Sequence, residues 1–347
     1  MKRICIIGNN IISLYNALKY NENNIEIHIY EKKNNIEYIN TNDNYVFCLF
    51  NDNHKSYINL LKKFSIKYSK INLQYNDKIY NIINMVIDKS KLLPNNISNS
   101  YSFIELCKNF LSNSDYDYIN NIANNNNILN YINGNDFINI INNDLNKKLN
   151  FYYIKEENIN ELINKLLIYL NKNNNIKFFY NTKINKINYN SRDNFFILND
   201  NIIKYNYIIS TISKKNLIEL NIWNQNQIRQ LNSVVNINMY NVKELIDIII
   251  NIDNLMIINN QEYDIKELLL NNLQFIYPQL KNKNKKLSIW KTYDNNNIHG
   301  KIMFRERVKF LYNNKFYLCN LGYSSSNIFI NYIFDNIDKT NFIKKKK

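Results

Sequence analysis

The first residues that could do chemistry lie in the opening thirty positions of the chain. Gly8 follows an apolar run at residues 4–7, and glycine can adopt the backbone angles of a sharp turn. A helix that begins just after this turn, near Asn10, would present free backbone N–H groups and the positive end of its dipole to an anion. Glu31 ends a second apolar run at about the 20-residue interval at which an acid accepts hydrogen bonds from ribose hydroxyls. Together these residues predict a site for the pyrophosphate and ribose of a dinucleotide.

Three short elements must hold these residues in place. Residues 4–7 and 25–29 predict strands, and apolar residues recur at helical spacing from Ile11 to Leu18. A strand, a glycine turn, a helix, a second strand and a terminal acid are the plan of a dinucleotide-binding βαβ unit. A buried βαβ unit without a nucleotide would have the same periodicity, so that alternative stays open.

The glycine fingerprint of such a unit, G-x-G-x-x-G, is incomplete. Gly8 holds its first position, and Asn10 and Ser13 hold the second and third. Asparagine tolerates left-handed backbone angles better than most residues, and serine is small, so the turn could form with less room for phosphate. The asparagine-rich chain has only 4 Gly and 2 Pro, whereas glycine usually makes up about 7% of a protein. A nucleotide-composition bias would explain this depletion and would erode a glycine motif whether or not function is retained.

Length and charge limit the class of protein. A chain of 347 residues with 45% hydrophobic residues is long enough for two domains or one large α/β domain. The net charge is +15, but the lysines are dispersed and no helix-turn-helix, zinc-finger or RNP-type pattern accompanies them. We therefore expect no specific nucleic-acid binding, only weak attraction to polyanions, and interpret residues 344–347 as a solvated basic tail. No apolar stretch reaches the roughly 18 residues of a membrane span, and no signal peptide is expected at the N-terminus.

Cysteine and histidine spacing gives no sign of a metal site. The four cysteines form no C-x-x-C pair, which argues against a disulfide framework or a zinc site and favours a reducing, cytoplasmic location. The three histidines also lack ligand spacing, so we expect structural roles for them. The residues concerned are Cys5, Cys48, Cys107, Cys319, His28, His54 and His299.

Beyond Glu31 the periodicity alternates between helical and strand-like segments. Residues 76–150 read as mostly helical, and residues 214–310 mix strands with helices. In chain order the individually predicted elements are a strand at 45–50, a helix carrying Tyr57, Leu60, Leu61 and Phe64, a helix at 158–170, a strand at 176–181, a hairpin, a strand ending at Ser210 and Thr211, strands at 234–240 and 287–290, helices at 242–250 and 265–273, and a closing strand, turn and helix at 316–337.

Three of these blocks, in this order, resemble the flavin-containing amine oxidase superfamily, which includes monoamine oxidases, protoporphyrinogen oxidase, phytoene desaturases and renalases. The first is the N-terminal βαβ unit. The second is the helix, strand, hairpin and strand of residues 158–213, and the third is the closing strand and helix of residues 315–337. Residues 54–68 and 287–293 also resemble family segments.

The resemblance implies an α/β fold with two parts. One is a Rossmann-like FAD-binding domain of the GR2 type, assembled from residues 1–75, 151–215 and 311–343. The other is an inserted α+β substrate domain, assembled from residues 76–150 and 216–310.

The resemblance also implies which residues contact the cofactor. Gly8, Asn10 and Ser13 match the diphosphate turn, Glu31 the acid on the adenosine ribose, and Ile184 a valine whose backbone contacts adenine. The full set of implied cofactor-binding residues is Gly8, Asn9, Asn10, Ile11, Ser13, Glu31, Lys32, Ile184, Thr211, Asn320, Leu321 and Tyr323. No cysteine lies in a motif for covalent flavin attachment, so FAD would be bound non-covalently.

The chain departs from the family pattern at several positions. The family's Gly-Gly pair falls at Glu37 and Tyr38, and its closing acid falls near Gly322. In some family members a lysine supports flavin oxidation. The candidates for it in this chain are Lys243 and Lys291, and each can also be explained as a lysine exposed to solvent. No catalytic residue is assigned.

Three functions remain open at this point. One is a FAD-dependent oxidoreductase of amine-oxidase type, which transfers hydride from an amine or related small molecule to flavin N5 and passes electrons to oxygen. Another is a degenerate relative that keeps the fold without catalysis and acts as a scaffold or binding protein. The third is a dinucleotide-binding protein of other chemistry or a basic interaction protein.

Overall fold

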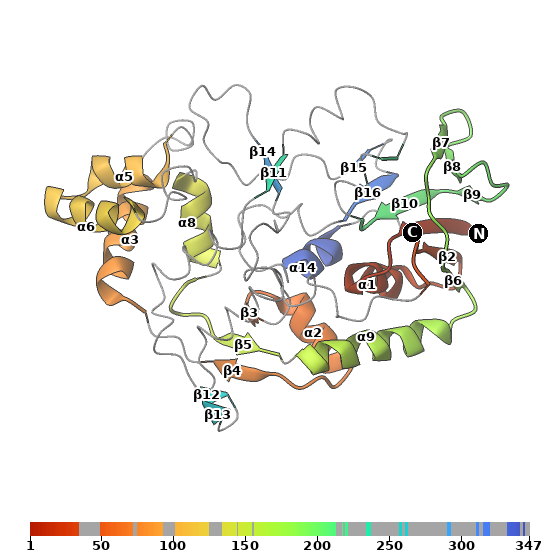
Figure 1. The fold of residues 1–347 in the computed structure, drawn as a ribbon, viewed down its shortest axis with the longest axis horizontal. Helices are drawn as coiled ribbons and strands as arrows, with labels where there is room; N and C mark the ends of the chain where they lie inside the picture. Colours follow the sequence, from red (N-terminus) through yellow and green to blue (C-terminus); the bar gives the residue numbers. More distant parts are fainter. Residues whose placement is uncertain are drawn as a thin grey trace.

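A parallel sheet organises the fold (Figure 1). The structure is a computed structural model that describes residues 1–34, 49–71, 75–92, 101–124, 134–143, 145–154, 156–212, 217, 219–220, 234–236, 257–258, 261–262, 290–292, 310–311, 315–319, 332–340 and 343. The strands lie in the order β15-β16-β10-β1-β2-β6, with β15 antiparallel to β16 and the other neighbours parallel. Their bounds are β1 Lys2–Ile7, β2 Ile25–Tyr30, β6 Ile176–Phe179, β10 Tyr207–Ser210, β15 Phe310–Leu311 and β16 Phe316–Leu318.

The strand order reverses at β1. From β1 the chain crosses through α1 (Ile11–Tyr20) to β2 on one side, and the later strand β10 pairs with the other side of β1. In open α/β sheets, ligands bind outside the carboxyl ends of the strands at such a switch point. The turn after Ile7 and the residues after Ser210 therefore lie where a ligand is expected.

Both faces of the parallel sheet are covered, which explains the apolar runs at residues 4–7 of β1 and 316–318 of β16. Side chains alternate across a strand, so Ile4 and Ile6 pack with the helices on one face, while Cys5 and Ile7 pack on the opposite face. The helical face is covered by α1, α9 (Glu156–Asn171) and α14 (Tyr332–Lys339). The opposite face is covered by a three-stranded antiparallel sheet, which we call the small sheet: β7 Ile187–Asn190, β8 Phe195–Leu198 and β9 Lys204–Tyr205.

The remaining described elements lie beside and away from this core. Helix α2 (Lys55–Lys63) contacts α14, and β3 (Leu49–Asn51), β5 (Phe151–Tyr153) and β4 (Ser69–Ile71) form an antiparallel sheet in that order. Four helices gather at the left of Figure 1, away from the parallel sheet: α3 Asp77–Ser90, α5 Phe103–Phe110, α6 Asn113–Asn124 and α8 Gly134–Asn143. Two small strand pairs are β11 (Val234–Asn236) with β14 (Trp290–Thr292), and β12 (Ile257–Ile258) with β13 (Gln261–Glu262).

The predicted mixed α/β chain with a parallel sheet is confirmed. The predicted strand at 45–50 is described only from Leu49 onward, where β3 begins. The predicted helices at 242–250 and 265–273 lie outside the described residues. Among the helices that are described, none combines the length and the apolar character needed to cross a bilayer.

Candidate functional site

Gly8 forms the turn at the carboxyl end of β1, and both its backbone and its surroundings require glycine. Its φ is +102°, a conformation that side chains with a Cβ rarely adopt. A Cβ at this position would lie 2.5 Å from Thr211 Oγ1 and 3.1 Å from Ile212 Cγ2. The turn is held to β2 because the Gly8 N–H donates to the Tyr30 carbonyl at 2.9 Å.

Glu31, directly after β2, holds the same turn through its side chain. Its Oε2 accepts the Asn9 N–H at 2.9 Å, and its Oε1 accepts the Lys33 N–H at 3.1 Å. The Glu31 backbone is fixed by a bond from its N–H to the Phe179 carbonyl at 2.9 Å. Each carboxylate oxygen can accept more than one hydrogen bond, so Glu31 keeps the capacity to accept ribose hydroxyls.

Asn10 caps the helix that follows, which differs from the role expected for the second fingerprint position. Its backbone is extended (φ −130°, ψ 177°), so its tolerance of left-handed angles is not used. Its Oδ1 accepts the N–H groups of Ile12 and Ser13, each at 3.0 Å, and Ser13 Oγ accepts the Asn10 N–H at 3.4 Å. This is a capping box, and the N-x-x-S spacing could have revealed it in the sequence.

Thr211 joins the end of β10 to this turn. Its Oγ1 lies 2.7 Å from Ser13 Oγ in a buried contact and also donates to the Ile7 carbonyl at 3.1 Å. The Asn10 Nδ2 donates to the Thr211 carbonyl at 3.3 Å. The fold therefore brings the predicted residues Gly8, Asn10, Ser13 and Thr211 together at the switch point.

Two buried polar side chains at this edge have no hydrogen-bond partner among the described residues. Asn9 is only 5% exposed, and neither its Oδ1 nor its Nδ2 forms a hydrogen bond with a described residue. Ser210 Oγ, at the end of β10, is in the same condition. An unsatisfied buried polar group costs about 1–3 kcal/mol, so in native proteins such groups call for a ligand, water or functional explanation.

The other predicted site residues are distributed around this turn or lie outside the described part. Ile11 is buried at the start of α1, and Lys32 is exposed just after Glu31. Ile184 is 8% exposed and packs in the cluster that contains Ile7 and Tyr30. The predicted cofactor-binding residues Asn320, Leu321 and Tyr323 lie outside the described residues. So do Glu37, Tyr38 and Gly322, where the chain departs from the family pattern, and Lys243, a candidate for the lysine that supports flavin oxidation.

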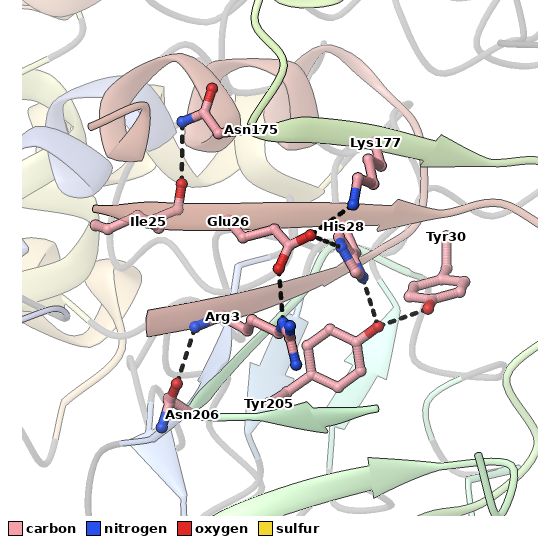
Figure 2. Close-up of polar contacts among 9 residues, drawn as sticks. All are labelled: Arg3, Ile25, Glu26, His28, Tyr30, Asn175, Lys177, Tyr205 and Asn206. Atoms are coloured by element: carbon pink, nitrogen blue, oxygen red, sulfur yellow. Dashed lines mark hydrogen bonds and ion pairs between the residues drawn. The ribbon is translucent and has the colours of Figure 1, made fainter. Parts of the chain in front are cut away.

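A polar network that was not predicted from the sequence joins β1, β2 and β6 around the buried carboxylate of Glu26 (Figure 2). Glu26 of β2 accepts Arg3 Nε at 2.6 Å and Lys177 Nζ at 2.7 Å, and His28 Nε2 lies 3.0 Å from its Oε1. The hydrogen bonds from Arg3 and Lys177 lower the pKa of Glu26 to about 2. The signal in the sequence is an alternating polar series, Glu26, His28 and Tyr30, on one face of a strand that is otherwise isoleucine.

The network continues from His28 to the small sheet. His28 Nδ1 lies 2.8 Å from the Tyr205 hydroxyl, which lies 2.6 Å from the Tyr30 hydroxyl (Figure 2). Burial lowers the pKa of His28 against the raising effect of Glu26. In the neutral tautomer protonated at Nε2, Nδ1 accepts the Tyr205 O–H and Nε2–H faces Glu26.

Neither described histidine is exposed for chemistry, and no cluster of three or more potential metal ligands occurs among the described residues. His54 Nδ1 accepts the Asn51 N–H at 3.0 Å, and burial lowers the pKa of His54 to about 4. Cys5, Cys107 and Cys319 are buried, and none of the three forms a disulfide bond among the described residues.

The fold resembles those of several solved oxidoreductases, although no protein-family model and no curated protein matches the sequence. An oxidoreductase from Methanosarcina mazei matches with a TM-score of 0.54 and 11% identity, over 97% of this chain and 100% of that chain. A double mutant of putrescine oxidase matches with a TM-score of 0.55 and 8% identity, over 98% and 100%. The chain has an oxidoreductase-like fold.

The likeness concerns the fold alone, because the sequence identities are low. Wild-type putrescine oxidase bound to putrescine matches with a TM-score of 0.50 and 10% identity, over 67% of this chain and 64% of that chain. Matches to a Pyrococcus furiosus protein and to a triple mutant of putrescine oxidase cover 65% and 63% of those chains. The chain thus spans just under two thirds of the length of these matched proteins.

Proposed function

We propose that the protein is a FAD-dependent oxidoreductase of amine-oxidase type, which transfers hydride from an amine or related small molecule to flavin N5, with oxygen as acceptor. The observation that carries this proposal is the Gly8 turn at the switch point, hydrogen-bonded to Glu31 through the Asn9 N–H. A tight glycine turn before a helix and an acid at the end of the next strand are parts of the dinucleotide-binding fingerprint, and Gly8, α1 and Glu31 supply them here. The likeness to putrescine oxidase and to the M. mazei oxidoreductase supports the same class.

The described residues fit an adenine dinucleotide at several points. Glu31 would accept hydrogen bonds from the adenosine ribose, the start of α1 would face the pyrophosphate, and Ile184 would lie beside the adenine. The side-chain amide of Asn9, which is buried and has no hydrogen-bond partner among the described residues, would offer a polar contact to the same ligand. When bound, FAD supplies the hydride acceptor, and the binding would be non-covalent.

We propose that one part of the chain binds FAD and another part binds the substrate. Residues 1–75, 151–215 and 311–343 would form the FAD-binding domain of GR2 type, and residues 76–150 and 216–310 would form the inserted substrate domain. The second part would orient a small-molecule substrate and exclude water from the reacting centre.

One observation favours a second candidate, a protein with this fold that acts as a scaffold without flavin. Asn10 Oδ1 already accepts the N–H groups of Ile12 and Ser13, which are the donors that a pyrophosphate would use at the start of a helix. A crevice whose donors are satisfied internally has less to offer a phosphate.

The absorbance spectrum of the purified protein separates the two candidates. An enzyme of the first kind should show the visible absorbance of flavin, either as purified or after incubation with FAD and removal of excess ligand. Glu31→Ala should lower the retained flavin, while Glu161→Ala, which removes an exposed acid on α9, should not. If folded protein retains no flavin after incubation with FAD, the enzyme proposal is wrong and the scaffold hypothesis replaces it.

If flavin is retained, its reduction identifies the substrate class. Amines and reduced nicotinamides would be added anaerobically, and loss of the oxidised flavin spectrum would be followed for each. Bleaching by amines alone supports the amine-oxidase type. Bleaching by reduced nicotinamide alone would replace it with another oxidoreductase class.

A further inference from the structure

The carboxamide of Asn10 occupies the place at the start of α1 where an anion would bind. A helix leaves its first N–H groups without intrahelical partners, and these groups together with the helix dipole attract phosphate. In this chain the N–H groups of Ile12 and Ser13 both donate to Asn10 Oδ1 at 3.0 Å. One neutral side-chain oxygen therefore satisfies two of the donors that a phosphate would need.

The carboxamide is also anchored on its other side. Asn10 Nδ2 donates to the carbonyl of Thr211 at 3.3 Å, and Ser13 Oγ lies 3.3 Å from Asn10 Oδ1. The side chain thus spans from α1 to the end of β10, across the two elements that border the switch point. A ligand phosphate that takes the two helix N–H groups must displace Oδ1 from them.

A second observation indicates that this edge is built for a polar ligand. The side chain of Asn9, next to Asn10, is buried and lacks a hydrogen-bond partner among the described residues. The first turn of α1 carries no acidic residue, so no charge on the helix itself repels phosphate.

We propose that Asn10 acts as an internal competitor for the phosphate groups of a dinucleotide and thereby weakens its binding in this crevice. The inference rests on the proposed dinucleotide site and deepens it, because it names the residue that sets affinity there. Displacement exchanges a neutral acceptor for an anionic one, and removal of the carboxamide leaves both N–H groups free for phosphate.

Asn10→Gly is the most informative variant. Glycine is nearly as good an N-cap as asparagine, so the helix is largely preserved, but the competing oxygen is gone. We expect ADP, which carries the adenosine and diphosphate without the flavin ring, to bind the variant about five-fold more tightly than the wild type in calorimetric titration, the gain of about one net hydrogen bond. The affinity for FAD, measured by fluorescence quenching, should change in the same direction.

Two further variants separate competition from loss of a cap. Asn10→Asp keeps a capping acceptor and adds a negative charge, so it should bind ADP more weakly than the wild type. Asn76→Ala removes the equivalent cap of α3, where Asn76 Oδ1 accepts the Ile79 N–H at 3.2 Å, and should leave ADP affinity unchanged. Circular dichroism would establish that each variant is folded.

The outcomes distinguish this inference from the proposed function. If wild-type protein binds ADP or FAD and folded Asn10→Gly binds no more tightly, the competitor role is wrong and the dinucleotide site stands. If Asn10→Gly binds and the wild type does not, the competitor role is supported and Asn10 keeps the native crevice closed to dinucleotides. If neither protein binds ADP or FAD, both proposals fall. Should Asn10→Gly fail to fold, the same criteria apply to Asn10→Ala.

Discussion

The hydroxyl of Tyr205 and Nδ1 of His28 lie 2.8 Å apart, and their hydrogen bond joins the small sheet to the parallel sheet (Figure 2). Tyr205 belongs to β9 and His28 to β2, and both are buried. The same hydroxyl lies 2.6 Å from that of Tyr30, the residue that directly precedes Glu31. The Tyr205 hydroxyl therefore links the small sheet both to His28 and to the end of β2, in addition to the apolar cluster that packs the two sheets together.

Replacement of Tyr205 by phenylalanine should destabilise the protein by about 1–3 kcal/mol, because it leaves the buried His28 Nδ1 and Tyr30 hydroxyl without this partner. Urea unfolding followed by circular dichroism would measure the change. Tyr189→Phe is the matched control, since it removes an exposed hydrogen bond to Asn194 in the same small sheet, and it should change stability by less than about 0.5 kcal/mol. Equal effects of the two substitutions would contradict this account.

Replacement of Glu26 by glutamine should remove an acid-dependent part of the stability. The folded pKa of Glu26 is lowered to about 2 from an ordinary value of 4.5, so its contribution is fully present above pH 4.5 and is lost as the pH falls toward 2. Because Arg3 and Lys177 are about half exposed and can regain water, we expect the substitution to cost about 1–3 kcal/mol at pH 7. The wild type and Glu26→Gln should converge in unfolding free energy as the pH falls below 4.5. A constant difference across that range would show that Glu26 acts without its charge.

His28 should make the protein less stable as the pH falls below neutrality. Its pKa is lowered from 6.5 by burial, so the unfolded chain binds a proton that the folded chain does not. Its contribution is therefore present above pH 6.5 and declines below it, by at most about 1.4 kcal/mol per pH unit. In urea unfolding between pH 7.5 and 5.5, His28→Gln should show a shallower pH dependence than the wild type. An NMR titration of the imidazole with a midpoint above 6.5 in the folded protein would reverse the expected sign.

Replacement of Gly8 by alanine should destabilise the turn by about 1–3 kcal/mol through its positive φ alone, and the approach of the new Cβ to Thr211 Oγ1 should add to this. Thermal unfolding would measure the loss. The double variant Gly8→Ala, Thr211→Ala should cost less than the sum of the two single variants, because the second change removes the atom that the Cβ meets. Additive costs would mean that the turn relaxes away from Thr211.

The local part of the fold could be predicted from the sequence. The strand, turn, helix and strand around Gly8 follow from apolar periodicity, and Glu31 follows from its place at the end of a strand. These features depend on residues within about 30 positions of one another. Over such a distance the spacing of apolar residues, glycine and acid is enough to predict the local structure. The helical face of α2 and the strand that ends at Ser210 were predictable for the same reason.

The βαβ unit and the position of its acid could be predicted from the sequence, because both depend on the spacing of residues that are close in the chain. Long-range packing places Thr211 against Gly8, brings Tyr205 to His28, and buries the Asn9 side chain, which has no hydrogen-bond partner among the described residues. These relationships join residues far apart in the chain or depend on what covers a side chain. The spacing of apolar residues along the sequence therefore does not predict them. The pairing of β10 beside β1 creates the first of them, because it places the ends of the two strands at one edge of the sheet.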